Sequence, residues 1–153
     1  MHTVIVSPMT VISLQFELPA APTQVFEFLQ DPARRQAWDV TAERATLDRE
    51  KAGKGAQLTV TGRRMAPSWE GRYTTFDPPK RSVLEVTPGP GMPFRSYTET
   101  IELRPNGKGS ILRYVIEYQT SGIWKLIEPF TVGSRLRKSA KRSTARIYDH
   151  FLE

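Results

Sequence analysis

The sequence predicts an α+β fold in which about seven antiparallel strands curve around one long C-terminal helix. Short segments of alternating apolar and polar residues follow one another between turns rich in Gly and Pro. Two short helical segments follow the first strand, and helical periodicity dominates roughly the last 30 residues. An antiparallel sheet of this kind normally has one covered face, and the long helix can cover it. We expect a cleft between sheet and helix, which is a natural ligand site.

The first predicted strand spans residues 10–18. Within it, Ile12, Leu14, Phe16 and Leu18 alternate with more polar residues and form one apolar face. A Pro-Ala-Ala-Pro run then ends the strand, because proline cannot donate a hydrogen bond to a strand ladder.

Two short helices are predicted after this strand. Thr23 is a candidate N-cap for the first of them. That helix should break at Asp31-Pro32, because the residue before a proline is pushed away from the α region. Residues 33–38 can then form one further helical turn.

The middle of the chain is strand-like and interrupted by turns. The run from Pro88 to Pro93 is a loop that cannot enter a ladder, and Asn106-Gly107 marks a strong hairpin turn. Six further strands are predicted, at residues 42–48, 57–63, 69–76, 82–86, 95–103 and 111–118.

The stretch from about residue 121 to 151 repeats apolar residues at steps of three or four, which predicts one long amphipathic helix. Pro129 should kink this helix or join two helical pieces. Four basic residues fall opposite its apolar stripe, and we call them the basic surface: Arg135, Lys138, Arg142 and Arg146.

The net charge of +6 is concentrated in this region. Residues 135–153 hold six basic and two acidic residues and so carry +4. A solvated helix face is the simplest explanation, and peripheral contact with an anionic membrane or an acidic ligand is an alternative. An isoelectric point near 9.8 would also permit nucleic-acid binding, but no nucleic-acid module is recognisable and we expect no such partner.

The length of 153 residues predicts a single domain over 1–153, with 1–9 as a tail or irregular lead-in. The absence of cysteine excludes disulfides, a thiolate nucleophile and a cysteine-type zinc site. The N-terminus lacks a signal-peptide pattern, and no stretch approaches the ~18 apolar residues of a spanning helix. We therefore expect a cytoplasmic protein.

Several segments, taken in order, resemble the START/Bet v 1-like (SRPBCC) superfamily and in particular its polyketide cyclase/dehydrase-like branch. The resemblance implies a helix-grip fold that holds a hydrophobic ligand between the sheet and the C-terminal helix. The superfamily includes lipid carriers, hormone binders and aromatic polyketide cyclases, so the resemblance says more about fold than about reaction. The matching segments are 14–29, Asp31-Pro32 followed by Trp38, Trp69 leading to 76–80, 109–113 and 151–153.

Glu99 is the most informative candidate site residue, because it shares a predicted apolar strand face with Tyr97, Ile101 and Leu103. An isolated carboxylate in an apolar cleft could act as an acid or a base. The alternative is that Glu99 pairs with an arginine on a neighbouring strand, or that the strand register differs from the predicted one.

Aromatic and apolar residues that share the predicted inner surface are candidates for lining the ligand cavity, and for each the alternative is packing in the core. Met92 and Phe94, in or next to the proline-rich loop, are candidates for an entrance flap, with an ordinary loop as the alternative. The candidate cavity residues are Trp38, Trp69, Tyr73, Tyr97, Glu99, Tyr114, Tyr118, Leu126, Ile127 and Phe130.

No standard catalytic or cofactor motif is recognisable in the sequence. The two histidines, His2 and His150, lie near opposite ends of the chain, and His150 is best explained as a surface residue of the helix. With no cysteine and two distant histidines, we expect neither a metal nor a cofactor.

The leading hypothesis is a protein that binds or carries a small hydrophobic ligand such as a lipid, isoprenoid or polyketide, as a monomer or homodimer. The alternative is a polyketide cyclase, aromatase or dehydratase, in which Glu99 and a Tyr or Arg such as Tyr73 or Arg113 would transfer protons. A third hypothesis is a module that docks on an anionic membrane or an acidic partner through the basic surface.

Overall fold

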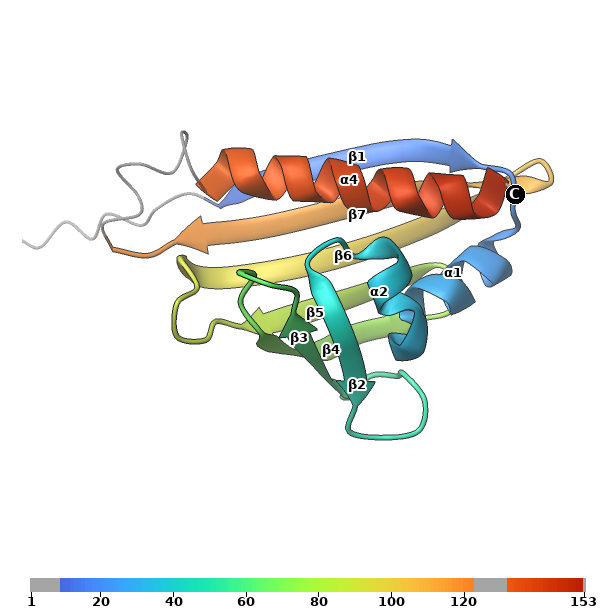
Figure 1. Ribbon diagram of the computed structural model, residues 1–153. Coiled ribbons are helices and arrows are strands. Elements are labelled where there is room, and N and C mark those ends of the chain that lie inside the picture. Colours follow the sequence, from blue (N-terminus) through green and yellow to red (C-terminus); the bar gives the residue numbers. More distant parts are fainter. Residues whose placement is uncertain (1–8, 123–131, 153) are drawn as a thin grey trace, which may run out of the picture.

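The computed structural model describes residues 9–122 and 132–152. Within these residues, seven strands form one antiparallel sheet in the order β1-β7-β6-β5-β4-β3-β2 (Figure 1). This confirms the predicted α+β architecture. The strands are β1 (Thr10–Leu18), β2 (Ala42–Leu47), β3 (Gln57–Gly62), β4 (Trp69–Asp77), β5 (Arg81–Thr87), β6 (Phe94–Asn106) and β7 (Gly109–Thr120).

The strands lie where the alternating pattern predicts them, and the last two are longer than predicted. The β6–β7 ladder continues to the pair Asn106–Gly109, because Gly107 adopts a positive φ of 61° that closes a tight hairpin. The ladders shift register between Ala42 and Arg44. They shift again between Tyr73 and Thr75 and between Phe94 and Ser96. Irregularities of this kind bend strands, and they contribute to the curvature of the sheet.

The first helical region confirms the two predicted short helices, and a 3₁₀ turn joins them. Helix α1 begins at Pro22 after Ala21, which has no side-chain cap, so the prediction of Thr23 as N-cap is wrong. Proline suits this first helical position because its fixed φ is already helical. The Asp31 side chain accepts a hydrogen bond from the Ala33 amide. The elements are α1 (Pro22–Gln30), η1 (Pro32–Arg34) and α2 (Arg35–Trp38).

The long C-terminal helix is α4 (Val132–Leu152), which lies over the sheet along β1 and β7 (Figure 1). Its buried side chains include Val132, Ala140 and Ile147, while most of its basic residues are exposed. Ser121 and Gly122, where this helix was predicted to open, are not helical. The rest of the predicted first part, with the kink at Pro129, falls on 123–131, which lie outside the described residues. Over the part of the chain that is described, no helix is both long enough and apolar enough to span a bilayer.

Two groups of buried apolar side chains form the core. The larger group joins α1 and α4 to β1, β6 and β7, and it includes Val25, Leu112 and Ile147. The smaller group lies on β2 to β5 and includes Val60 and Leu84. Helix α2 and the polar side chains around it lie beside both groups, and there the described structure contains a cavity.

Candidate functional site

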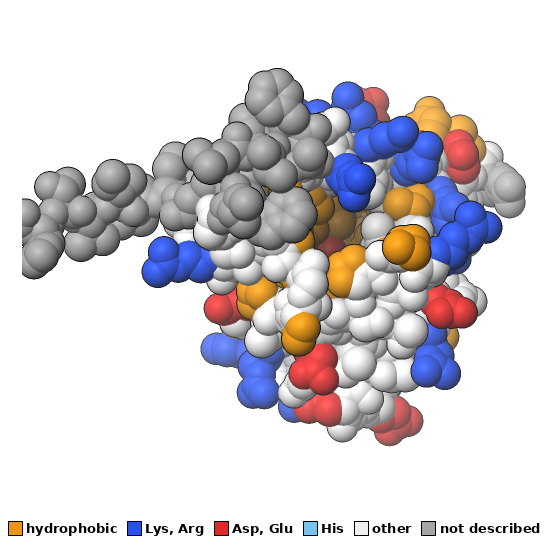
Figure 2. All heavy atoms as spheres, turned by 60° about the vertical axis from the view of Figure 1, so that its left-hand side comes forward, with side chains coloured by type: hydrophobic (Ala, Val, Ile, Leu, Met, Phe, Trp, Pro, Cys, Tyr) orange, Lys and Arg blue, Asp and Glu red, His pale blue; other side chains and the backbone are white. Residues whose placement is uncertain are grey.

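A cavity of about 330 Å³ lies between the inner face of the sheet and α4. Among the described residues, three segments surround its mouth: the turn between β3 and β4, the loop between β5 and β6, and the first half of α4. Figure 2 shows this face as a hollow with hydrophobic side chains on its walls. The apolar part of the lining includes Trp69, Val86, Met92, Phe94, Ile116 and Leu136.

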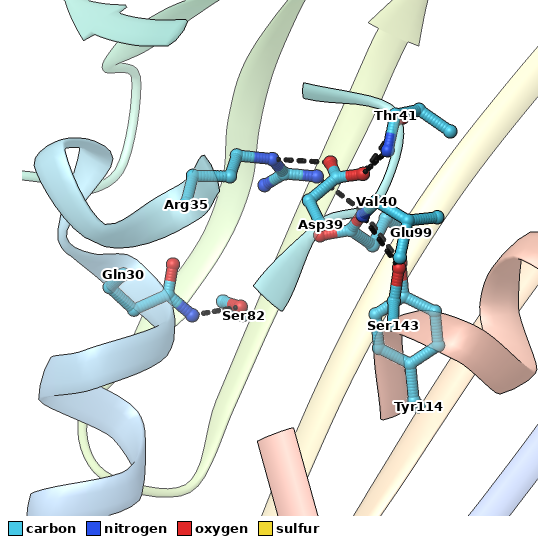
Figure 3. Close-up of polar contacts among 9 residues, drawn as sticks. All are labelled: Gln30, Arg35, Asp39, Val40, Thr41, Ser82, Glu99, Tyr114 and Ser143. Atoms are coloured by element: carbon cyan, nitrogen blue, oxygen red, sulfur yellow. Dashed lines mark hydrogen bonds and ion pairs between the residues drawn. The ribbon is translucent and has the colours of Figure 1, made fainter. Parts of the chain in front are cut away.

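A cluster of ionised side chains forms one wall of this cavity, with Arg35 at its centre (Figure 3). Arg35 Nε donates to Asp39 Oδ2 at 2.9 Å, and Arg35 Nη2 donates to Glu99 Oε2 at 2.8 Å. The Tyr114 hydroxyl donates to the same Glu99 oxygen at 3.0 Å. All four residues line the cavity and are buried, so the charges of Arg35, Asp39 and Glu99 are paired inside the fold and away from bulk water.

Two tryptophans hold the Arg35 guanidinium from the side. Its Cζ lies 4.7 Å from the ring centroid of Trp38 and 5.1 Å from that of Trp69. Stacking on indole rings favours a planar cation and fixes its orientation. The Trp38 Nε1 is buried and has no hydrogen-bond acceptor among residues 9–122 and 132–152. The arrangement makes Arg35 a rigid part of the cavity wall.

The residues in and directly after α2 hold the polar wall of the cavity in position. Arg35 and Asp39 are four positions apart, the spacing at which side chains of one helical turn meet. Asp39 Oδ1 then accepts from both the backbone amide and the hydroxyl of Thr41, at 3.0 and 2.7 Å, which fixes the exit from α2. The amide of Val40, between Asp39 and Thr41, donates to the Ser143 hydroxyl of α4 at 3.1 Å. Helix α2 is therefore bonded to the sheet, and the segment that follows it is bonded to the long helix.

The electrostatics of the cluster keep Arg35 charged. Burial alone would lower the pKa of Arg35, but the carboxylates of Glu99 and Asp39 outweigh burial and hold that pKa well above its usual value. Burial, and then the charge of Glu99, raise the pKa of Tyr114 well above its usual value, and the same two causes raise the pKa of Tyr97. Both phenols are therefore neutral hydrogen-bond donors at physiological pH.

The structure brings most of the described candidate residues to the cavity. Six of them line it: Trp69, Tyr97, Glu99, Tyr114, Met92 and Phe94.

Three aromatic candidates lie in the core and are not part of the cavity lining. Trp38 is fully buried beneath Arg35, and Tyr73 packs edge-on against Phe76. Tyr118 is fully buried and packs edge-on against Phe94. The candidates Leu126, Ile127 and Phe130 lie outside the described residues.

Arg113 does not lie near Glu99. Successive residues of a strand point to opposite faces of a sheet, and Arg113 is adjacent to the inward-facing Tyr114. On the outer face, its exposed side chain lies 3.5 Å from Glu102. Glu99 does pair with an arginine, as one alternative predicted, but that arginine is Arg35 of α2 and comes from a helix instead of a neighbouring strand.

The four residues of the basic surface are exposed on α4, as predicted. Arg135 differs from the others because it also lines the mouth of the cavity. His150 stacks on the Phe28 ring at 4.0 Å between centroids, and it is not part of the cavity lining.

Sequence reasoning missed Arg35, Asp39 and Ser143, the residues that complete the polar wall. An available signal was the Arg35–Asp39 pair at helical spacing, together with Trp38, because residues three apart share a helix face and a buried tryptophan three positions after Arg35 favours an inward Arg35. Ser143 gave no such signal in the sequence. Among the described residues, no group of three or more His, Asp or Glu side chains is arranged to hold a metal ion.

Comparisons with known proteins identify the family and the fold of this chain. A family model described as polyketide cyclase/dehydrase and lipid transport matches residues 9–151. No curated protein matches the sequence significantly.

Among the solved structures with the same fold are proteins from Thalictrum flavum, Panax ginseng and Colwellia psychrerythraea. Truncated norcoclaurine synthase from Thalictrum flavum has a TM-score of 0.71 at 18% identity, covering 99% of each chain. The major latex-like protein 151 from Panax ginseng has a TM-score of 0.72 at 12% identity, covering 95% of this chain and 99% of that one. The Aha1 dimer from Colwellia psychrerythraea has a TM-score of 0.70 at 10% identity, covering 93% and 96%. At these identities the likeness concerns the fold alone.

Proposed function

The chain belongs to the polyketide cyclase/dehydrase and lipid transport family of the START/Bet v 1-like superfamily, and on this basis we propose that it binds a small, largely apolar molecule in the cavity beneath α4. The observation that carries the proposal is the cavity itself, with apolar and aromatic walls and one polar wall. Ligand pockets combine these features, with many apolar contacts and a few fixed polar groups.

The size of the cavity favours a compact ligand. Its volume of about 330 Å³ is at the lower end of the ~300–1,000 Å³ that is usual for small-molecule sites. A molecule of two or three fused rings suits this space better than a long acyl chain. Trp69, Phe94 and Tyr97 offer ring faces and edges to such a ligand.

Binding of N-phenyl-1-naphthylamine, a neutral fluorescent probe, tests this proposal. We expect saturable binding that raises the emission of the probe. Val86→Phe places a larger side chain on the cavity wall, where it occupies space that the probe would fill. The probe then loses apolar contacts, and its binding should weaken at least about tenfold. Thr87→Phe adds the same ring at the next position, which is exposed, and should leave binding unchanged. Absence of binding, or equal binding by both variants, would refute the proposal.

A second candidate is a cyclase or dehydratase, favoured by the position of Glu99 and Tyr114 on the cavity wall. Norcoclaurine synthase, an enzyme by name, has the same fold. In this alternative the cavity folds a flexible substrate and Glu99 exchanges a proton with it. Glu99 Oε2 already accepts hydrogen bonds from Arg35 and Tyr114, which leaves Oε1 as the oxygen that would exchange the proton. Undiminished turnover of a responsive polyketide by Glu99→Gln would remove Glu99 from that role.

A third candidate, peripheral contact with an anionic membrane, is favoured by the rim of the cavity. Met65 is 98% exposed at the tip of the turn between β3 and β4, and it lines the mouth together with Arg135. An apolar tip beside basic side chains suits an anionic lipid surface.

Reversing the four charges of the basic surface should abolish co-sedimentation with vesicles that contain phosphatidylserine. Retention of binding would refute the membrane contact. A matched control reverses four exposed bases elsewhere and should leave binding unchanged: Lys80, Arg81, Arg104 and Lys108.

A further inference from the structure

We propose that the polar end of the ligand is a hydrogen-bond donor, such as a hydroxyl or an amine, that Glu99 accepts this hydrogen bond, and that the cavity rejects carboxylates. The inference rests on the proposed function and specifies the class of ligand. It starts from the charge of the buried wall. Arg35, Asp39 and Glu99 are 3%, 7% and 5% exposed, and as ion pairs they sum to one net negative charge.

Arg35 is the obvious group to attract an anionic ligand, but its own neighbours already neutralise it. Its Nε and Nη2 donate to Asp39 and Glu99 at 2.9 and 2.8 Å. Trp38 and Trp69 flank the guanidinium at 4.7 and 5.1 Å. A ligand carboxylate near Arg35 would therefore meet two buried carboxylates in a water-poor site, where repulsion between like charges is strong.

Glu99 has acceptor capacity for a ligand. A carboxylate offers about four acceptor sites. The donors Arg35 and Tyr114 both use Oε2, and no described residue donates a hydrogen bond to Oε1. Because Glu99 lines the cavity, a ligand hydroxyl can approach this carboxylate directly. Hydrogen bonds to an ionised acceptor are stronger than those between neutral groups.

The remaining ionisable groups around the cavity, Tyr97 and Arg135, do not change the negative charge of this inner wall. Tyr97 also lines the cavity, but it adds no charge because burial and Glu99 raise its pKa. Arg135 is exposed at the mouth, where water and salt screen its charge. The inner wall therefore favours a donor and disfavours an anion.

Three naphthalenes of similar shape test the inference on the unmodified protein at neutral pH: 2-naphthol, 2-naphthoate and 2-methylnaphthalene. Their affinities are measured by displacement of N-phenyl-1-naphthylamine. We expect 2-naphthol to bind about tenfold or more tightly than 2-naphthoate, and more tightly than 2-methylnaphthalene. The inference is overturned if 2-naphthoate binds as well as 2-naphthol, or if the hydroxyl gives no gain over the methyl group. If neither the probe nor any naphthalene binds, the proposed function fails as well.

A pair of variants on β6 tests the assignment to Glu99. Glu99→Gln removes the inward-facing charge and should reduce the preference for 2-naphthol over 2-naphthoate about tenfold. Glu102→Gln removes the same charge from the opposite face of the strand, where Glu102 pairs with Arg113 and Arg81, and should leave the preference unchanged. An unchanged preference in a folded Glu99→Gln variant would overturn the assignment. If that variant does not fold, the comparison on the unmodified protein still decides the inference.

Discussion

Arg35 and Glu99 are 64 positions apart in the sequence, and their side chains form an ion pair with 2.8 Å between Nη2 and Oε2. Both side chains are almost fully buried, at 4% and 5% exposure. The pair joins the short helix α2 to the middle of the sheet and fixes one wall of the cavity. Removing one partner of such a pair leaves the charge of the other buried and uncompensated.

Substituting Arg35 should therefore destabilise the fold strongly. Arg35→Met leaves Asp39 and Glu99 without their cation, and we expect the free energy of unfolding to fall by about 3–5 kcal/mol. The free energy of unfolding is measured by urea denaturation, with tryptophan fluorescence as the signal. Arg34→Met is the matched control, because the adjacent Arg34 is exposed and pairs only loosely with Asp31 at 3.5 Å. The control should lose less than about 1 kcal/mol, and equal losses in both variants would contradict the argument.

The buried tyrosines should make stability fall at high pH. Burial, opposed by Arg35 and assisted by Glu99, raises the pKa of Tyr73 to about 12, whereas a tyrosine in the unfolded chain ionises near 10. Between these values the folded chain keeps a proton that the unfolded chain has lost, so stability is full below pH 10 and declines as pH rises toward 12.

Tyr73→Phe tests this dependence. The variant should show a stability decline shallower by about 1.4 kcal/mol per pH unit across that interval. Denaturant titrations at several pH values measure the slope, and absorbance of tyrosinate in the folded and denatured protein checks the ionisation directly. Identical slopes in the variant and the unmodified protein would show that Tyr73 ionises at its ordinary pKa.

Much of the sheet could be predicted because the patterns that indicate strands and turns are local in the sequence. Period-two alternation and the turn at Asn106-Gly107 gave all seven strands nearly at their observed bounds. The same alternation places Glu99 and Tyr114 on one inner face. The same alternation could have excluded Arg113 as a partner of Glu99, because Arg113 directly precedes Tyr114 and so points to the other face of the sheet.

Depth within the fold could not be predicted in this way. Tyr114 and Tyr118 share a strand face, yet Tyr114 lines the cavity while Tyr118 is fully buried and packs against Phe94. Whether an inward residue lines a cavity or fills the core depends on what packs over it, and that is a tertiary property. The Arg35–Glu99 pair was missed for the same reason, since it joins a helix and a strand that lie far apart in the sequence.

The packing of α4 against the sheet should contribute a large part of the stability. Ile147 is fully buried on the inner side of this helix among core residues. Ile147→Ala removes three carbons there, and we expect a loss of about 2–5 kcal/mol in the free energy of unfolding, measured by chemical denaturation. Leu152→Ala shortens an apolar side chain that is 56% exposed on the same helix and should cost much less. A small loss for Ile147→Ala would contradict the docking of α4 described above.

The turn at the cavity mouth should depend on a glycine. A Cβ at Gly62 would lie 2.6 Å from the Pro67 carbonyl oxygen and closer still to that of Ala66, and both residues line the cavity. Backbone atoms cannot give way as a flexible side chain can, so Gly62→Ala should displace the turn. We expect a loss of about 1–3 kcal/mol in stability, together with a changed affinity for N-phenyl-1-naphthylamine.

Gly53→Ala separates this steric effect from the general loss of chain flexibility. A Cβ at Gly53 meets nothing within 4 Å, so alanine there only restricts the unfolded chain and should leave stability unchanged or slightly higher. Probe affinity should also be unchanged, because Gly53 is not part of the cavity lining. If both variants behave alike, the close approach at Gly62 does not hold the turn in place. If Gly62→Ala alone loses stability and alters probe affinity, the turn between β3 and β4 shapes the entrance to the cavity.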